Sequence, residues 1–303
     1  MYPYNINSKI IEISNSRPFN IVLITKSNIQ HKRLLFRLTE EFGSLVKRCY
    51  IYERSVKSKK GFTNQKIKAP YFNRESYIRL FSMKKIYRYY LKIIKRANDS
   101  SISRLNDYIH MEMASFSEKN LGNRIKEIYP NDINREWFLK DIKLQDPTIL
   151  ISCGGPILPQ KVILAIKGLA INQHAGFSPH YKGRYTTLIP LYKKDLNHVG
   201  NTIHITSPNV DEGDIIRRST PAFCPDDDER SIGLRNSILG NELLMEALKE
   251  LIETRRLRVF EQEKTGETIL KNNYDIPRVS FEVNQAIRSN WLNNELDRIS
   301  SFW

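Results

Sequence analysis

The chain has 303 residues, of which 40% are hydrophobic and 27% are charged, a composition typical of globular proteins. No apolar run approaches the roughly 18–20 residues that a membrane-spanning helix needs, and the first residues lack the apolar stretch of a signal peptide. The cysteines, Cys49, Cys153 and Cys224, are odd in number and far apart, which argues against a disulfide framework. These features exclude membrane-spanning and disulfide-stapled classes and predict a cytoplasmic protein.

The net charge of +15 is concentrated in one segment. Residues 53–96 contain fourteen Lys or Arg and only two Glu, a local balance of +12, which leaves about +3 for the rest of the chain. Basic charge placed in this way is expected either on a solvated helix surface or at a contact with phosphate or another polyanion. Both interpretations stay open at this point.

In chain order, residues 1–18 are expected to form an N-terminal extension. The apolar run 20–26 predicts a buried strand, Asn28 is a candidate N-cap for a helix reaching about residue 41, and 46–52 predicts a second strand. This βαβ order favours a parallel sheet of the nucleotide-binding type. No GxGxxG follows the first strand, which argues against a dinucleotide cofactor.

Residues 53–125 have the character of an insertion. A Lys-rich loop over 53–75 is followed by helical spacing of Tyr77, Leu80, Phe81, Tyr87, Leu91 and Ile94, and a second helix is expected over 101–118. An apolar stripe of this kind must be buried on the core or on a second subunit. A homodimer therefore stays open.

The second half predicts a helix over 133–143, a strand over 148–155, a helix over 159–167 and a strand over 169–175, which complete another βαβ unit. Further strands are expected at 202–206 and 215–220, and a long amphipathic helix at 229–254. The predicted fold is α/β, Rossmann-like, with a mostly parallel sheet and flanking helices. The catalytic domain would span 19–228, and 229–303 would form a mainly helical C-terminal extension.

Candidate chemical groups stand at the ends of predicted strands, where open α/β sheets bind their ligands. They are Asn172 and His174, then Asp211, and the turn at 154–159. Each is weak evidence alone, because a single His is usually structural and an Asp before Glu-Gly is usually a turn former. No His pair has metal-ligand spacing with a carboxylate or Cys, so no metal is predicted. His204 is expected to be structural.

Taken together, these groups resemble the folate-dependent formyltransferases. The pattern reads Asn172-Gln-His174, then Ser178-Pro179 followed by Gly183, and later Asp211-Glu-Gly213 before an apolar strand. The resemblance covers about seventy residues, 148–216, and the strand and turn ILISCGGPILP belong to it. The family includes methionyl-tRNA formyltransferase, glycinamide ribonucleotide transformylase and sugar N-formyltransferases.

The chemistry of formyl transfer explains these residue types. When an amine attacks a formyl carbon, the intermediate carries an oxyanion and an ammonium. An Asn172 amide can donate to the oxyanion, and His174 can take the proton because its pKa lies near neutrality. Asp211 would orient the imidazole and stabilise its protonated form. The resemblance implies the same three roles.

The resemblance also implies 10-formyltetrahydrofolate as cosubstrate. Its pterin would lie against two segments, the turn of Gly155, Pro156, Ile157 and Leu158 and the loop of Pro208, Asn209 and Val210. For a phosphate on the acceptor, the cations beside the motif are Lys182 and Arg184, with Lys193 and Lys194 as second choices.

The acceptor amine is inferred by elimination. Only 49 residues follow the long helix, too few for the C-terminal barrel of methionyl-tRNA formyltransferases together with a helical tail. Glycinamide ribonucleotide transformylases lack the insertion, and formyltetrahydrofolate deformylases carry an extra domain ahead of the motif. A nucleotide-linked amino sugar is therefore the favoured small-molecule partner. Methionyl-tRNA formyltransferase and an RNA-contacting protein with a degenerate core stay as alternatives.

Overall fold

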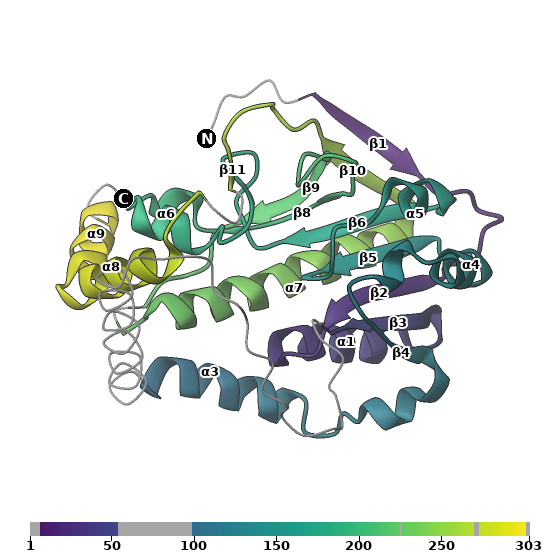
Figure 1. Cartoon of the computed structure of the whole chain (residues 1–303), viewed down its shortest axis with the longest axis horizontal. Coiled ribbons are helices and arrows are strands. Elements are labelled where there is room, and N and C mark those ends of the chain that lie inside the picture. The colour runs from purple at the N-terminus through teal and green to yellow at the C-terminus, as the bar shows by residue number, and fades with distance from the viewer. Residues whose placement is uncertain (1–6, 54–98, 225, 270–272, 301–303) are drawn as a thin grey trace, which may run out of the picture.

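The computed structural model describes residues 7–53, 99–224, 226–269 and 273–300. In these residues nine strands form one twisted sheet, and helices cover both of its faces (Figure 1). The predicted basic loop and the apolar stripe between Tyr77 and Ile94 lie outside the described residues. None of the helices in the described segments is long enough and apolar enough to cross a membrane.

The five strands at one end of the sheet are parallel. These strands, in the order β4-β3-β2-β5-β6, are β4 (Ile125–Ile128), β3 (Val46–Tyr52), β2 (Ile21–Lys26), β5 (Ile149–Cys153) and β6 (Leu169–His174). The first five residues of β2 and all of β5 are buried. Strands buried on both faces read as continuous apolar runs, which is why these segments were predictable. The predicted α/β class is confirmed.

An antiparallel extension continues the sheet beyond β6. It consists of β8 (Asn201–Ile205), β9 (Ile215–Ser219), β10 (Arg256–Phe260) and β1 (Ser8–Glu12). The N-terminal strand β1 thus pairs with β10, far along the chain. Two short strands, β7 (Tyr181–Gly183) and β11 (Glu267–Ile269), pair separately in parallel.

Long helices cover the two faces. On one face α1 (Ile29–Phe42) and α7 (Glu229–Thr254) bury Leu34, Leu35, Leu244 and Leu248 against the sheet. On the other face α4 (Glu136–Gln145) and α5 (Gln160–Ala165) bury Phe138, Ile142 and Val162. The remaining helices are α3 (Asp99–Glu112), α6 (Leu188–Tyr192), α8 (Ile276–Arg288) and α9 (Trp291–Ser300), with 3₁₀ turns at Gly43–Leu45, Glu118–Arg124, Asp132–Asn134 and Leu196–His198.

The helix α7 has the bounds expected from its sequence. Asp228 accepts from the Ser231 backbone N–H at 2.8 Å, and the Ser231 hydroxyl accepts from the Asp228 N–H, which together form a capping box. The predicted boundary at 229 therefore coincides with the start of a helix that belongs to the main core. The helices α8 and α9 pack beside the start of α7 through a third apolar cluster that includes Ile232, Val279 and Val283.

Candidate active site

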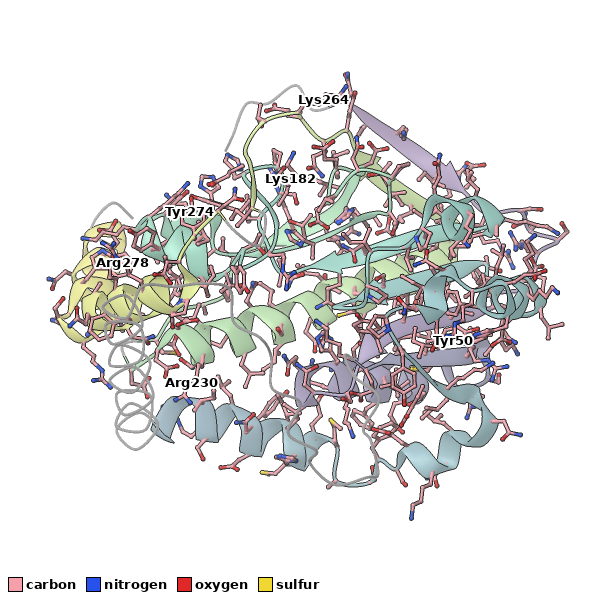
Figure 2. The ribbon with its side chains drawn as sticks, in the orientation of Figure 1. Tyr50, Lys182, Arg230, Lys264, Tyr274 and Arg278 are labelled. Atoms are coloured by element: carbon pink, nitrogen blue, oxygen red, sulfur yellow. The ribbon has the colours of Figure 1, made fainter. Side chains whose placement is uncertain are left out.

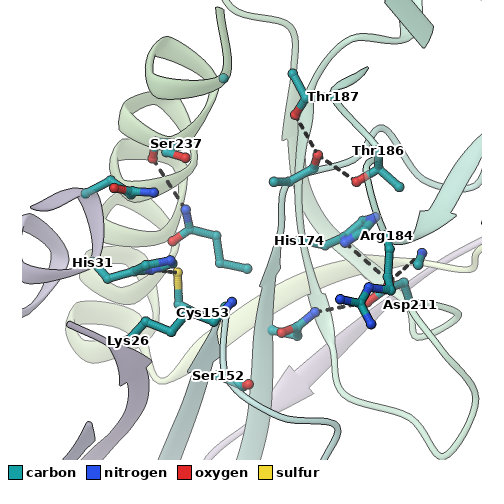
Figure 3. Close-up of a pocket in the computed structure, with 18 of the residues that line it drawn as sticks. Lys26, His31, Ser152, Cys153, His174, Arg184, Thr186, Thr187, Asp211 and Ser237 are labelled. Atoms are coloured by element: carbon teal, nitrogen blue, oxygen red, sulfur yellow. Dashed lines mark hydrogen bonds and ion pairs between the residues drawn. The ribbon is translucent and has the colours of Figure 1, made fainter. Parts of the chain in front are cut away.

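A cavity of about 1210 Å³ opens at the carboxyl ends of β2, β5 and β6. From β2 the chain adds β3 and β4 on one side, and from β5 it adds β6 on the other, so the strand order reverses between β2 and β5. Open α/β sheets bind ligands at such a reversal. Figure 3 shows His174, Arg184 and Asp211 on one side of the cavity, and His31 and Ser237 of the α1 and α7 side opposite them. The predicted catalytic residues all line it.

Asn172 and His174 lie on the same face of β6 because alternate side chains of a strand point the same way. Strand β8 pairs with β6 in antiparallel register, so that His204 stands opposite Asn172. Asp211 comes from the loop between β8 and β9 and has a left-handed backbone with φ of 53°. Three segments that are separate in sequence thus converge on one point.

His174 is 6% exposed, and both of its ring nitrogens face oxygen atoms. Nδ1 lies 3.2 Å from Asp211 Oδ2, and Nε2 lies 3.1 Å from the Tyr181 carbonyl oxygen. Burial lowers the pKa of His174, although the Asp211 carboxylate and the Tyr181 carbonyl favour its protonated form. A neutral ring has one N–H. When this proton is on Nδ1 it is donated in a hydrogen bond to Asp211, and Nε2 is then the nitrogen that can accept a proton.

The amide of Asn172 is fully engaged. Nδ2 donates to Asp211 Oδ1 at 3.1 Å and lies 3.0 Å from His204 Nε2. His204 Nδ1 lies 2.8 Å from the Ile205 carbonyl oxygen, and its Nε2 also lies 3.4 Å from Asp211 Oδ1; when the only ring proton is on Nδ1, Nε2 accepts from Asn172. Donation from Asn172 to a ligand therefore requires the loss of one of these two contacts.

Asp211 is the centre of the arrangement. Its Oδ2 also accepts the Gly183 backbone N–H at 2.9 Å. Burial would raise the pKa of Asp211, but His174, His204 and the Gly183 N–H together hold the pKa well below its usual range. Gly213, two residues on, has no room for a side chain, because an added Cβ would lie 1.7 Å from the Ile205 carbonyl oxygen. The Asp-x-Gly spacing is thus a packing requirement.

The residues expected to hold the folate meet at the same cavity. Gly155, Pro156, Ile157 and Leu158 line it from the loop after β5, and Pro208, Asn209 and Val210 line it from the loop after β8. Ile157 is 75% exposed and leaves apolar surface open at the cavity. These assignments stay predictions.

The two residues predicted to bind a phosphate lie in different surroundings. Arg184 lines the cavity. Lys182 is 4% exposed and pairs with Glu212 at 2.7 Å, and it is not among the residues that line the cavity (Figure 2 labels it). A buried, already neutralised ammonium has little to offer a phosphate.

Sequence reasoning missed parts of this site. His204 was expected to be structural, yet it contacts Asn172 directly, and this contact depends on the pairing of β8 with β6, which the sequence did not predict. The wall formed by α7 was missed as well, because 229–254 was predicted only as an amphipathic helix; the residues at i, i+4 spacing that line the cavity are Glu229, Gly233, Ser237 and Asn241.

Comparison with known proteins finds formyltransferases. Residues 111–248 match the model of the formyl transferase family. The predicted resemblance to this family is confirmed over these residues. A methionyl-tRNA formyltransferase from Limosilactobacillus fermentum is 30% identical over 133 residues, which are 44% of this chain. The match spans 42% of the length of that relative.

Two solved formyltransferase structures share the fold. An N-formyltransferase from Helicobacter canadensis, in complex with folinic acid and dTDP-3-aminofucose, is 14% identical, with 88% of this chain and 80% of that chain covered and a TM-score of 0.51. A 4-N formyltransferase from Francisella tularensis is 15% identical, with 86% of both chains covered and a TM-score of 0.50.

Proposed function

We propose that this chain transfers a formyl group from 10-formyltetrahydrofolate to a primary amine in the cavity at β5 and β6. The observation that carries the proposal is the convergence of Asn172, His174 and Asp211 on that cavity, with contacts of 3.1 and 3.2 Å to the carboxylate. The match of residues 111–248 to the formyl transferase family supports the same reaction.

In this mechanism the amine nitrogen attacks the formyl carbon, and the formyl oxygen becomes an oxyanion. His174 Nε2 takes the proton that the attacking nitrogen loses. It then gives this proton to the folate nitrogen as the bond between that nitrogen and the formyl carbon breaks. The Nδ1 proton stays on the Asp211 side, where the carboxylate stabilises the imidazolium between the two steps. The products are a formamide and tetrahydrofolate.

Asn172 stabilises the oxyanion. A preorganised donor of this kind contributes about 3–4 kcal/mol in a site that excludes water. Since both amide hydrogens already have partners, the oxyanion competes with the neutral His204 nitrogen for one of them. An anion is the stronger acceptor, so we expect the amide to move from His204 to the oxyanion as charge develops.

The acceptor that we favour is a nucleotide-linked amino sugar, in a cytoplasmic enzyme. The solved neighbour from Helicobacter canadensis contains such a ligand together with a folate. The sequence relatives keep methionyl-tRNA as a second candidate acceptor.

A panel of acceptors tests the proposal. The purified chain is incubated with 10-formyltetrahydrofolate and, separately, dTDP-3-aminofucose, glycinamide ribonucleotide or methionyl-tRNA, and the release of tetrahydrofolate is followed. We expect transfer to the amino sugar nucleotide at a kcat/KM at least about tenfold above the other two, a difference of about 1.4 kcal/mol. Faster transfer to methionyl-tRNA would overturn the choice of acceptor. An absence of transfer to all three would overturn the proposed reaction.

A further inference from the structure

The short strand β7 makes hydrogen bonds along both of its edges. On one edge the Tyr181 carbonyl oxygen lies 3.1 Å from His174 Nε2. On the same edge the Gly183 backbone N–H donates to Asp211 Oδ2 at 2.9 Å. The backbone groups of alternate residues in an extended strand point toward the same side. One edge of β7 therefore contacts both His174 and Asp211, which stand together in Figure 3.

The other edge of β7 pairs with β11, in parallel, over all three residues of each strand. At the two ends the Glu267 N–H donates to the His180 carbonyl oxygen at 2.8 Å, and the Arg184 N–H donates to the Ile269 carbonyl oxygen at 3.0 Å. Gly183 has φ of 91°, and a Cβ added to it would lie 2.4 Å from the Ile269 carbonyl oxygen. The strand β11 thus lies directly against the β7 backbone and fixes the direction of the groups on its opposite edge.

Lys182 stands between the two residues of β7 that contact the catalytic pair. It is 4% exposed, and its Nζ donates to Glu212 Oε1 at 2.7 Å. Glu212 directly follows Asp211 in the chain. Two neighbouring residues of β7, Lys182 and Gly183, are therefore joined to two neighbouring residues of the loop between β8 and β9. One contact holds the catalytic carboxylate itself, and the other holds the residue after it.

The loop between β8 and β9 needs this support. Asp211 has a left-handed backbone with φ of 53°, which is unfavourable for a residue that carries a side chain. The second oxygen of Glu212, Oε2, accepts from Asn209 Nδ2 at 3.0 Å. The hydrogen bond from Lys182 lowers the pKa of Glu212, which keeps the carboxylate ionised. Glu212 thus connects β7 on one side with the preceding part of its own loop on the other.

The ion pair of Lys182 and Glu212 is better explained by geometry than by stability. A buried ion pair adds little stability relative to apolar side chains of the same shape, but it fixes the direction of the groups that it joins. Of the described residues, Arg184 lines the cavity and Lys182 does not. Any effect of Lys182 on the reaction must therefore pass through the loop that carries Asp211.

We propose that Lys182 is a positioning residue for the catalytic carboxylate. Through Glu212 it holds Asp211 in the place from which Asp211 orients His174, and β11 supports the same arrangement from the far edge of β7. This role differs from the phosphate contact that the sequence predicted for Lys182. It rests on the proposed function and adds to it the contacts that set the geometry of the catalytic pair.

The variant Lys182→Met separates positioning from the simple effect of charge. Removal of the ammonium leaves the Glu212 carboxylate without this partner, and the added negative charge would by itself raise the pKa of His174. If Lys182 positions Asp211, the loop is released and His174 loses part of its contact with the carboxylate. The pKa of His174 then falls, because burial continues to disfavour the charged ring. The two explanations predict shifts of opposite sign.

The first measurement is the pKa of His174, followed by NMR of protein labelled with ¹⁵N in its histidine rings. His174→Ala identifies the signal. Besides burial, the groups that act on this pKa are Asp211, His204 and the Tyr181 carbonyl oxygen. We expect the pKa of His174 to be lower in Lys182→Met than in the wild type. An unchanged or higher pKa would overturn the positioning role.

The second measurement is turnover with 10-formyltetrahydrofolate and dTDP-3-aminofucose. In Lys182→Met, kcat should fall at least about tenfold, because a small displacement of a catalytic group is enough to slow the reaction. The KM of both substrates should stay within about twofold. Lys182→Arg, which keeps a cation for Glu212, should retain most of kcat. The control is Lys249→Met, which breaks the 3.0 Å pair with Glu41 and does not line the cavity.

Glu212→Ala keeps the test open if Lys182→Met does not fold, since the Glu212 side chain is 33% exposed. Its kcat should fall by a similar factor, and an unchanged kcat would overturn the proposal. If the wild type transfers no formyl group but Lys182→Met lowers the pKa of His174, the positioning role stands and the proposed reaction fails. If the wild type is active and Lys182→Met keeps both its kcat and the pKa of His174, the positioning role is wrong and the reaction stands.

Discussion

His174 is held between two oxygen acceptors, Asp211 Oδ2 and the Tyr181 carbonyl, and this decides how it can act. In the neutral ring the Nε2 lone pair faces the Tyr181 carbonyl oxygen. When Nε2 takes a proton, this contact becomes a hydrogen bond, which stabilises the protonated ring. Burial works in the opposite direction and lowers the pKa. The balance leaves a neutral base at rest whose protonated form is stabilised locally, which a proton carrier needs.

The catalytic roles are tested by Asn172→Ala, His174→Ala and Asp211→Ala. Each should lower kcat by at least about a hundredfold, because each removes a group that acts on the transition state. His198→Ala is the control, since His198 stacks on His180 and does not line the cavity. Near-normal turnover of the His174 variant, with circular dichroism like that of the wild type, would contradict the mechanism.

His204 should act through Asn172. Its Nε2 accepts from the amide and so fixes the direction of the Asn172 side chain. His204→Phe keeps a ring at this position but removes the acceptor, and we expect kcat to fall about tenfold while the KM for folate stays within about twofold. A loss of stability alone, with kcat per folded molecule unchanged, would show that His204 only packs.

His31 should couple stability to pH. Burial and the nearby Lys26 lower the pKa of His31 to about 4, and its Nδ1 lies 3.3 Å from Cys153 Sγ. The unfolded state takes up a proton near pH 6.5 and the folded state does not, so stability is complete above pH 6.5 and falls as the pH is lowered toward 4. The expected loss is up to about 3 kcal/mol. In urea titrations at pH 7.5 and 4.5, His31→Gln should lose less stability between the two than the wild type.

At the scale of elements, a buried charge joins three helices. Arg33 of α1 is 1% exposed, and it reaches Glu112 of α3 and Glu242 of α7 with contacts of 2.6 Å each. Removal of one carboxylate leaves the guanidinium partly unpaired in the interior, whereas surface pairs contribute little. This network connects α3 with α1 and α7.

The matched pair Glu112→Ala and Glu118→Ala tests this attachment. Glu118 pairs with Lys32 at 2.8 Å, but both side chains are more than a third exposed. We expect Glu112→Ala to lower the free energy of unfolding by about 3 kcal/mol and Glu118→Ala by less than about 1 kcal/mol. Equal effects in chemical denaturation would show that the Arg33 network does not bear on stability.

The same elements show what the sequence could and could not predict. The strands β2 and β5 and the helix α7 were predictable because their apolar periodicity and capping are local properties. The pairing of β1 with β10 was not, since it joins residues almost 250 positions apart and leaves no local pattern. The motif is also a local pattern, and it predicted Asn172, His174 and Asp211. His204 and the α7 wall could not be predicted, because they depend on which elements become neighbours in the fold.

At the scale of the whole molecule, most of the net positive charge belongs to residues 53–96. The basic segment 53–96 lies outside the described residues, but the chain on both sides of it is described. Tyr52, at the end of β3, and Ile102 and Asn106 of α3 all line the cavity. The described residues on both sides of the segment therefore lie at the cavity. This favours the interpretation in which its charge serves a phosphate-bearing acceptor.

Charge replacement tests that interpretation. In the triple variant Lys84→Gln, Lys85→Gln and Arg88→Gln, the KM for an amino sugar nucleotide should rise several-fold. The KM for 10-formyltetrahydrofolate should stay nearly unchanged. The wild-type acceptor KM should also rise between about 0.05 and 0.5 M salt, because exposed charges are screened over a few ångströms at high ionic strength. The control removes equal charge elsewhere, at the exposed Lys140, Lys143 and Lys167. If the two triple variants keep the same acceptor KM and each lose less than about 0.5 kcal/mol of stability, the basic segment is only a solvated surface.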